Sequence, residues 1–192
     1  MTERTYDRIV VAAGELTAEL GWSAVTMTKL ADRAGVSRQT VYNEVGSKSE
    51  LGEALVMREL IGFLDVVEKA FADQPHDVVE ALRAAAYGVL RMAPDNALLQ
   101  AIVSASHGGA NDLLPLLTTR SDALVGVTKD VLGRRLRDYE IGMEEQEFQA
   151  AVDMLVRVVL SHVMHPTADP QRTADDIAWL GARVLVASPR TA

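Results

Sequence analysis

The segment from residue 26 to residue 48 constrains the fold of this chain more than any other part of its sequence. Apolar residues recur three and four apart over residues 28–34, which predicts a short helix with one buried face. Gly35 follows this helix and tolerates the positive φ that a tight turn between two helices needs. Ser37 then stands where a polar side chain can cap a second helix over residues 38–45. The segment therefore predicts two short helices that meet at a sharp turn.

The second of these helices is predicted to expose a row of hydrogen-bonding side chains. Val41 and Val45 supply its buried face, so the remaining positions point outward. They are Arg38, Gln39, Thr40, Tyr42, Asn43 and Glu44. A short helix with such groups can enter the major groove of DNA, where base edges are read. The alternative is an ordinary turn between two helices with a solvated polar face.

More features coincide in this segment than an ordinary turn requires. Position by position, it resembles the DNA-binding signature of the tetracycline-repressor (TetR) family of bacterial regulators, over roughly residues 6–55. The resemblance implies a ligand-responsive transcriptional regulator, a repressor that a small effector releases from a palindromic operator. The matching residues are Thr26, Leu30, Ala31, Ala34, Gly35, Val36, Ser37, Thr40, Tyr42, Ser47, Lys48, Glu50 and Leu51.

The sequence departs from the family pattern directly after Tyr42. The family commonly has an aromatic residue or histidine there, followed by phenylalanine, whereas this chain has Asn43, Glu44 and Val45. Val45 keeps an apolar side chain at the position of the family's phenylalanine, but a smaller one. Asn43 either reads a base edge or is solvated, and Glu44 repels phosphate if it faces the DNA backbone. These differences concern which operator is read, and not whether DNA is bound.

Side-chain chemistry and the resemblance together assign the DNA contacts. Arg38 suits O6 and N7 of guanine, Gln39 suits N6 and N7 of adenine, and Thr40 can contact a base edge or a thymine methyl group. Contacts to phosphates position a protein on DNA without reading its sequence; they are predicted for Tyr42, Lys48, Thr28 and Ser37. The complete predicted DNA-binding set is Thr28, Ser37, Arg38, Gln39, Thr40, Tyr42, Asn43 and Lys48.

The charge distribution fits a protein that meets DNA through one face. Between Thr26 and Lys48, four basic residues stand against two acidic ones, for a net charge of +2. The whole chain carries −8, so the remainder carries −10. An acidic body with one locally basic segment repels DNA everywhere else.

The rest of the chain also predicts helices, because alternation with a period of two between hairpin turns is absent. The predicted fold is all-α, with about nine helices. A three-helix helix-turn-helix DNA-binding domain over residues 1–50 precedes a helical effector-binding and dimerisation domain over residues 51–192. Ser47 and Glu50 form a capping-box pattern that opens a long fourth helix, reaching about residue 71. Further helices are predicted over residues 6–20, 77–92, 96–106, 113–117, 121–139, 144–164 and 173–187.

Two C-terminal helices suggest a second copy of the chain as a partner. One short recognition helix gives little affinity, so such modules usually pair across half-sites about one helical turn apart. The helix from Phe148 to Met164 is apolar on nearly every side, which predicts burial on more than one side. The resemblance implies a homodimer through this helix and the one from Thr173 to Ala187; closure of a monomeric core is the alternative. The small and apolar residues that the last helix offers are Ala174, Ile177, Ala178, Gly181, Val184 and Leu185.

The resemblance also implies an effector pocket in the helical region between about residues 55 and 165. Methionine and aliphatic residues with only 5% aromatic residues favour a flexible apolar effector, such as a long-chain acyl or alkane-like compound. Ordinary core packing is the alternative for each residue, and Asn96 is among further polar groups that can orient a ligand. The predicted ligand-binding residues are Phe63, Tyr87, Leu90, Arg91, Leu99, Val103, His107, Met154 and Val158.

Several classes of protein are disfavoured. The chain has no cysteine, which excludes disulfides and thiolate metal sites, and His162 and His165 lack a carboxylate partner set, so no metal or cofactor is predicted. No nucleophile–base arrangement is recognisable, which leaves an all-helical enzyme as a remote alternative. An activator or a protein-responsive regulator of the same fold is a nearer one. No stretch reaches the roughly 18 apolar residues of a membrane span, and no signal peptide is recognisable, so we expect a cytoplasmic protein.

Overall fold

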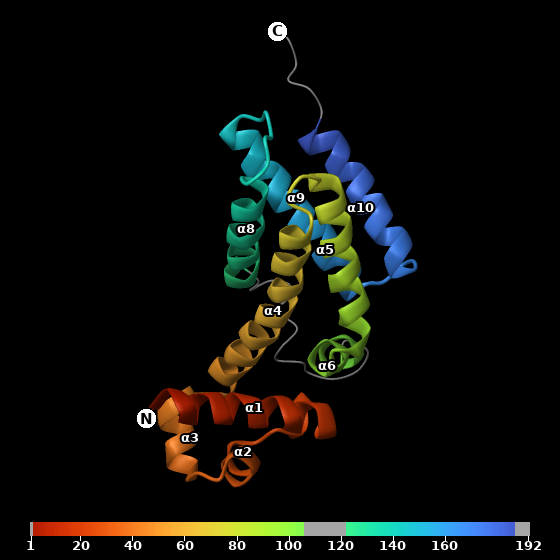
Figure 1. Ribbon diagram of the computed structural model, residues 1–192. Coiled ribbons are helices and arrows are strands. Elements are labelled where there is room, and N and C mark those ends of the chain that lie inside the picture. The colour runs from red at the N-terminus through yellow and green to blue at the C-terminus, as the bar shows by residue number, and fades with distance from the viewer. Residues whose placement is uncertain (1, 106–121, 187–192) are drawn as a thin grey trace. The chain divides into compact units, whose positions relative to one another are not determined.

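The computed structural model describes residues 2–105 and 122–186, and within these ranges the chain is helical apart from short connections (Figure 1). No strand occurs in the described residues, which confirms the all-α prediction. The predicted helix over residues 113–117 and the candidate ligand residue His107 lie outside them. The elements are α1 (Thr2–Leu20), η1 (Trp22–Ala24), α2 (Met27–Ala34), α3 (Arg38–Val45), α4 (Lys48–Asp73), α5 (Val78–Met92), η2 (Ala93–Asp95), α6 (Ala97–Ala105), α8 (Asp122–Leu136), α9 (Glu145–Met164) and α10 (Pro170–Leu185).

The helix boundaries follow their capping residues. The capping box is confirmed: the backbone N–H of Ser47 donates to Glu50 Oε2 at 2.7 Å, and that of Glu50 donates to Ser47 Oγ at 3.2 Å. The last helix begins at Pro170, three residues before its predicted start. Asp169 explains the difference, because its carboxylate accepts a hydrogen bond from the N–H of Gln171 at 2.8 Å and Pro170 suits the first helical position.

The described residues form two compact units. The first contains α1, η1, α2, α3, α4 as far as Leu60, and α6; the second contains α4 from Ile61, then α5, η2, α8, α9 and α10. This grouping follows contacts within each unit and does not test the functional division at residue 50, which stays a prediction.

The core of the first unit joins α1 to the three helices that follow it. Side chains from α1, α2, α3 and α4 are excluded from solvent there, and α1 also packs against α6. Burying an aliphatic side chain of this size stabilises the folded state by about 1.5–3 kcal/mol. The fully buried aliphatic residues of this core are Ile9, Val25, Leu30, Val41, Leu51 and Leu55.

In the second unit α10 packs along α5, and α8 packs along α9 (Figure 1). Gly181 permits the first contact, since a Cβ at this position would lie 2.7 Å from Cδ1 of Leu82. The small face of α10 is therefore covered inside the subunit, and the partner contact predicted for it is instead a contact with α5. The apolar side chains that α10 exposes are Trp179, at 60%, and Leu180, at 36%.

The C-terminal halves of α4 and α8 are joined by polar contacts as well as by packing. The Tyr139 hydroxyl donates to the carbonyl of Gln74 at 2.6 Å, and its ring meets Phe71 edge-on with 6.0 Å between centroids. Arg135 pairs with Glu68 beside them. Burial raises the pKa of Tyr139, with a smaller contribution from the nearby charge of Asp138. The phenol therefore stays protonated and keeps its hydrogen bond throughout the physiological pH range.

Within the described ranges, no helix has the length and apolar content needed to cross a membrane.

Candidate nucleic-acid interface

The turn between α2 and α3 has the backbone that the sequence predicts. Thr26 caps α2 by accepting a hydrogen bond from the N–H of Lys29 at 3.3 Å. Gly35 ends the helix in the left-handed conformation, with φ 65° and ψ 40°, where a side chain would be strained. The N–H of Val36 then donates to the carbonyl of Ala31 at 3.0 Å, which completes the C-terminal cap. Two residues therefore separate the last residue of α2 from the cap of α3, Ser37.

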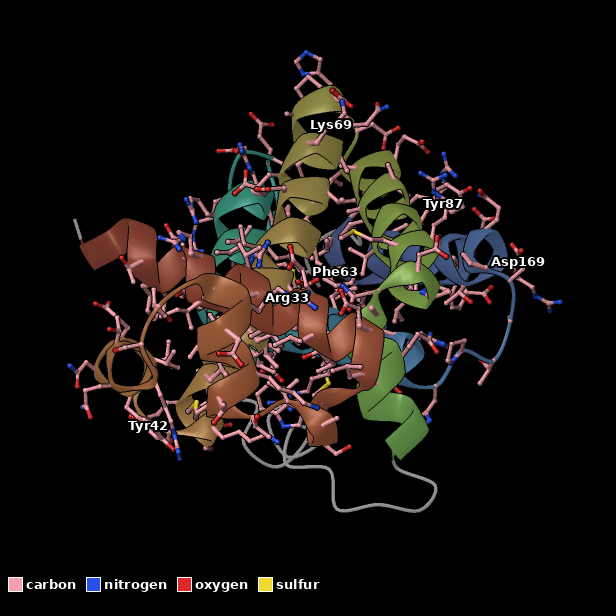
Figure 2. All side chains as sticks on the ribbon, turned by 90° about the horizontal axis from the view of Figure 1, so that it is seen from below. Arg33, Tyr42, Phe63, Lys69, Tyr87 and Asp169 are labelled. Carbon is pink, nitrogen blue, oxygen red and sulfur yellow. The ribbon has the colours of Figure 1, made fainter. Side chains whose placement is uncertain are left out.

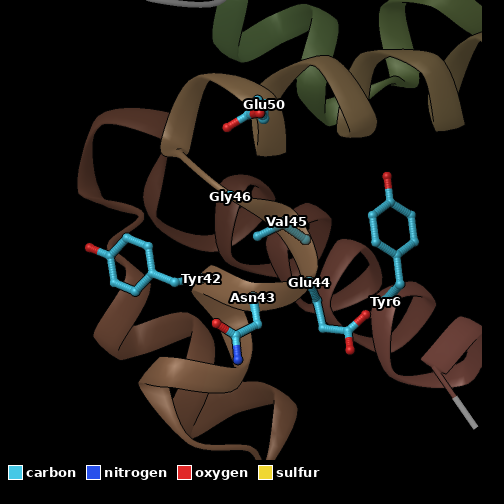
Figure 3. Close-up of a pocket in the computed structure, with 7 residues that line it drawn as sticks. All are labelled: Tyr6, Tyr42, Asn43, Glu44, Val45, Gly46 and Glu50. Carbon is cyan, nitrogen blue, oxygen red and sulfur yellow. The ribbon is translucent and has the colours of Figure 1, made fainter.

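The apolar side chains of α3 lie on its buried side, and most of its polar side chains lie on its exposed side. Val41 and Val45 are buried at 0% and 5% exposure, while Arg38, Gln39, Tyr42 and Asn43 are exposed (Tyr42 is labelled in Figure 2). Tyr42 and Asn43 leave α3 in directions different from that of Val45 (Figure 3). The predicted base-reading face of α3 is therefore free of contacts that would bury it in the described chain.

The exposed side chains of α3 are joined in pairs along the helix. Arg38 Nη2 donates to the Tyr42 hydroxyl at 3.3 Å, and its guanidinium lies 5.5 Å from the centre of that ring. Gln39 Nε2 donates to Asn43 Oδ1 at 2.9 Å. Residues four apart lie on the same side of a helix, which explains both pairs. The polar groups of this face therefore lie close together in pairs.

Ser37 and Thr40 form the N-terminal edge of the same face. The Ser37 hydroxyl caps α3 by accepting the N–H of Thr40 at 3.0 Å, and the two hydroxyls share a hydrogen bond at 2.8 Å. Thr28 is exposed in the first turn of α2, as a contact to a DNA phosphate requires.

Two lysines lie against the η1 turn. Lys48 Nζ donates to the carbonyl of Ser23 at 3.4 Å and sits 5.1 Å from the ring centre of Trp22. Lys29 Nζ donates to the next carbonyl, that of Ala24, at 3.1 Å. Adjacent carbonyls therefore gather two ammonium groups at one place on the surface. The sequence motif points to Lys48 but not to Lys29, because the η1 turn that brings the two lysines to neighbouring carbonyls has no clear signal in the sequence.

Charged contacts hold α1 and α2 together behind this face. Arg33 on α2 pairs with Glu19 at 2.6 Å and with Glu15 at 3.3 Å, both on α1. The hydrogen bond from Arg33 lowers the pKa of Glu19, and the bonds to Glu19 and then Glu15 raise the pKa of Arg33. Arg8 on α1 also donates to the carbonyl of Ala34 at the end of α2. These contacts connect α2 to α1 close to the turn that leads to α3.

Glu44 does not lie on the base-reading face. Its side chain is half-buried and points toward Tyr6, at one side of a hollow of about 380 Å³ (Figure 3). Tyr42, Asn43 and Glu50 are among the other residues that line the hollow. The carboxylate of Glu44 therefore lies on the side of α3 that faces Tyr6 (Figure 3).

The predicted ligand-binding residues are distributed over both units. Leu90 is buried in the second unit, where Phe63, Tyr87 and Val158 are half-buried and Arg91 is exposed. Leu99 is buried in the first unit, and Val103 lies on α6 there. No described contact tests their role in binding a ligand, so the assignment stays a prediction.

Met154 and Asn96, which the sequence suggested as ligand contacts, have surroundings that favour other roles. Met154 is 62% exposed on α9, which favours an interface over the lining of an internal cavity. Asn96 is buried at 8% exposure, but its polar atoms are occupied. Its Nδ2 donates to Glu59 at 2.7 Å, and its Oδ1 accepts the N–H of Leu99 at 2.9 Å. Asn96 therefore caps the N-terminus of α6.

A capped helix-turn-helix with an exposed polar second helix, followed by a separate helical body, defines a DNA-binding transcriptional regulator. Residues 9–55 match the family of bacterial regulatory proteins named after TetR, and residues 77–183 match the C-terminal domain of the bacterial tetracycline repressor. The C-terminal match alone spans more than half of the chain. The chain belongs to the TetR family, as its DNA-binding segment predicted.

Two relatives are regulators of known name. The chain is 29% identical over 175 residues to the transcriptional regulator AlkX of Mycobacterium tuberculosis (strain ATCC 25618 / H37Rv), covering 91% of this chain and 82% of that protein. It is 35% identical over 63 residues to the transcriptional activator FasR of Mycolicibacterium smegmatis, which is 33% of this chain and 29% of that one.

Solved structures show the same architecture. The TetR-family repressor AlkX from Dietzia sp. strain DQ12-45-1b, implicated in biodegradation of n-alkanes, superposes with a TM-score of 0.79 at 26% identity, covering 93% of this chain and 96% of that one. RolR in complex with resorcinol shares the fold with a TM-score of 0.64 at 16% identity, covering 98% and 95% of the two chains.

Proposed function

We propose that this regulator is a homodimeric repressor that binds a palindromic operator and leaves it when a small apolar effector binds. The observation that carries its reading of DNA is the exposed face of α3, where four polar side chains lie opposite a buried valine face. In this proposal the protein acts in the cytoplasm and has no catalytic activity.

The proposed DNA contacts divide into those that position the protein and those that read bases. Tyr42, Lys48, Thr28 and Ser37 contact phosphates, as does Lys29, because its ammonium group lies beside that of Lys48 on the η1 turn. Arg38, Gln39 and Thr40 face base edges in the major groove, and Asn43 lies beside Gln39 on the same face.

The proposed effector is a long-chain acyl or alkane-like compound. The similarity to two regulators named AlkX supports this class, since the one from Dietzia is implicated in the degradation of n-alkanes. The effector acts by population shift: it binds better to a conformer in which the two recognition helices no longer fit successive grooves. Because the two binding sites are coupled, operator DNA must weaken effector binding by the same factor.

The proposed dimer uses the outward faces of α9 and α10. Met154 on α9 is 62% exposed and Trp179 on α10 is 60% exposed, more than any other large apolar side chain in the described residues. A second copy of the chain would cover these side chains and set the distance between the two copies of α3.

An electrophoretic shift with the DNA that flanks the protein's own gene tests the proposal. We expect a retarded complex with a specific segment of that DNA, dissociated by a long-chain alkane or fatty acid but not by a short-chain one. A complex that every such compound leaves intact would contradict the proposed effector class. Failure to retard any flanking DNA would contradict an operator beside the protein's own gene.

An activator of the same fold is the second candidate, because FasR, which matches 63 residues of this chain, is a transcriptional activator. A reporter gene behind the bound DNA separates the two. Repression predicts higher reporter expression when the regulator gene is deleted, and activation predicts lower expression.

A further inference from the structure

Asn43 occupies a position where this chain departs from its family, and its side chain already has a partner. Its Oδ1 accepts a hydrogen bond from Nε2 of Gln39, one turn earlier on α3, at 2.9 Å. Both side chains are exposed, so nothing else in the described residues fixes the carboxamide of Gln39. In this contact the amide nitrogen of Gln39 faces the side-chain oxygen of Asn43.

The orientation of a carboxamide decides which base it can read. Glutamine reads adenine with its oxygen on the N6 amino group and its nitrogen on N7, and turning the amide over exchanges donor and acceptor. With one hydrogen of Nε2 committed to Asn43, the second hydrogen and the whole of Oε1 remain available. These are the donor and the acceptor that adenine requires, in a fixed order along the helix.

We propose that Asn43 is a positioning residue that supports the reading of adenine by Gln39, because its side-chain oxygen holds the carboxamide nitrogen of Gln39 in place on the exposed face of α3. The proposal rests on the DNA-reading function proposed for α3. It differs from direct reading by Asn43, because Asn43 and Gln39 then govern the same base position and not two neighbouring ones. The effect of losing either residue is shared and not additive.

Two substitutions of Asn43 separate positioning from other roles. Asn43→Asp keeps an oxygen that can accept the hydrogen bond from Gln39, whereas Asn43→Ala removes it. The added charge of aspartate repels the phosphates of every duplex, so the comparison uses only the preference between bases at the position that Gln39 reads. Asn43 is exposed, and alanine favours helices, so the variants should fold; their thermal midpoints by circular dichroism are the control.

The experiment is selection from a library of duplex DNA with a randomised core, followed by sequencing. We expect the unchanged protein to enrich a two-fold symmetric motif, and Gln39→Ala to reduce the preference at one base position of each half-site by about fivefold or more. Asn43→Ala should reduce the preference at that same position. The double variant should be no worse than Gln39→Ala, and Asn43→Asp should retain the preference.

Three results would overturn the proposal: a motif unchanged by Asn43→Ala, a loss at a different base position from that of Gln39→Ala, or no loss with Gln39→Ala. If the unchanged protein enriches no motif, then sequence reading by α3 itself is contradicted. Failure of the positioning role is thereby distinguished from failure of the proposed function.

Discussion

The DNA-reading segment and the helical body that follows it in the sequence depend on different kinds of residue for their structure. In the first, a glycine with φ 65°, a serine cap and a capping box each occupy a position that few other residues can fill. In the second, α5 and α10 are joined by alanine, leucine and glycine, and many apolar sets would pack as well. Because the DNA-reading segment needs particular residues at particular positions, its function can be predicted from the sequence. The helical body needs only apolar residues that pack, so its sequence says little about its function.

The two regions should nevertheless be equally sensitive in their cores. Leu51 and Leu136 are both fully buried, one in each unit. We expect Leu51→Ala and Leu136→Ala each to reduce the free energy of unfolding by about 2–5 kcal/mol, measured by urea denaturation. Leu20→Ala, at a position 48% exposed, is the control and should change it by about 0.5 kcal/mol or less. A large loss in one region alone would mean that the regions differ in packing and not only in surface chemistry.

The exposed face of α9 is predicted to hold the dimer together. Met154→Glu places a charge on that face, and we expect sedimentation velocity at micromolar concentration to show a shift from dimer to monomer. Val11→Glu, on α1 at a position 38% exposed, is the matched control and should leave the dimer intact. A dimer unchanged by Met154→Glu would return Met154 to the list of candidate ligand contacts.

A cap from each region gives a finer comparison. Ser37 caps α3, and Asp77 caps α5 by accepting the N–H groups of Val79 and Glu80 at 3.1 and 2.9 Å. Each substitution by alanine should cost about 1 kcal/mol of stability. Only Ser37→Ala should also weaken DNA binding beyond what its lost stability explains, measured by fluorescence anisotropy well below the melting temperature. Equal effects on DNA binding would show that Ser37 acts only through helix stability.

The smallest expected effect concerns the capping box that opens α4. The hydrogen bond from the backbone N–H of Ser47 lowers the pKa of Glu50 below its ordinary value of 4.5. A carboxyl group with a lowered pKa in the folded state stabilises it above its unfolded pKa, and this contribution disappears as the pH falls through the folded pKa. The contribution of Glu50 is therefore expected to be complete at neutral pH and lost below pH 4.5.

Glu50→Gln isolates this contribution, because glutamine keeps a hydrogen-bond acceptor but does not titrate. We expect the unchanged protein to melt slightly higher than Glu50→Gln at neutral pH, and the difference to vanish in acid. A difference in melting temperature that is constant with pH would contradict a role for the charge of Glu50.

How far the sequence could predict the structure follows the same division. The bounds of α3 coincide with the predicted residues 38–45, because Ser37 and Gly46 mark both ends. The early start of α10 was missed, although Asp169 and Pro170 are a cap and a first-turn residue. The side of α10 that meets α5 could not be predicted, because its small residues suit a contact within one subunit as well as a contact between two.

The candidate site was predictable only in part, for the same physical reason. The outward side chains of α3 follow from helical periodicity, but the pairing of Gln39 with Asn43 depends on rotamers, and Lys29 depends on the η1 turn. The effector site depends on how helices distant in sequence enclose a cavity, and no short motif encodes that. For the effector site, the composition of the chain predicted only the chemical class of the effector.

The central claim, that α3 reads DNA sequence while neighbouring basic groups only anchor the protein, is tested most directly by fluorescence anisotropy on two duplexes. One is the bound flanking DNA and the other a scrambled duplex of equal length, each measured at two salt concentrations with Arg38→Ala and with Lys48→Ala. Arg38→Ala should lose about 1–3 kcal/mol of discrimination between the duplexes, whereas Lys48→Ala should weaken binding to both and flatten the salt dependence. Unchanged affinities for both variants would contradict the assignment of this face to DNA.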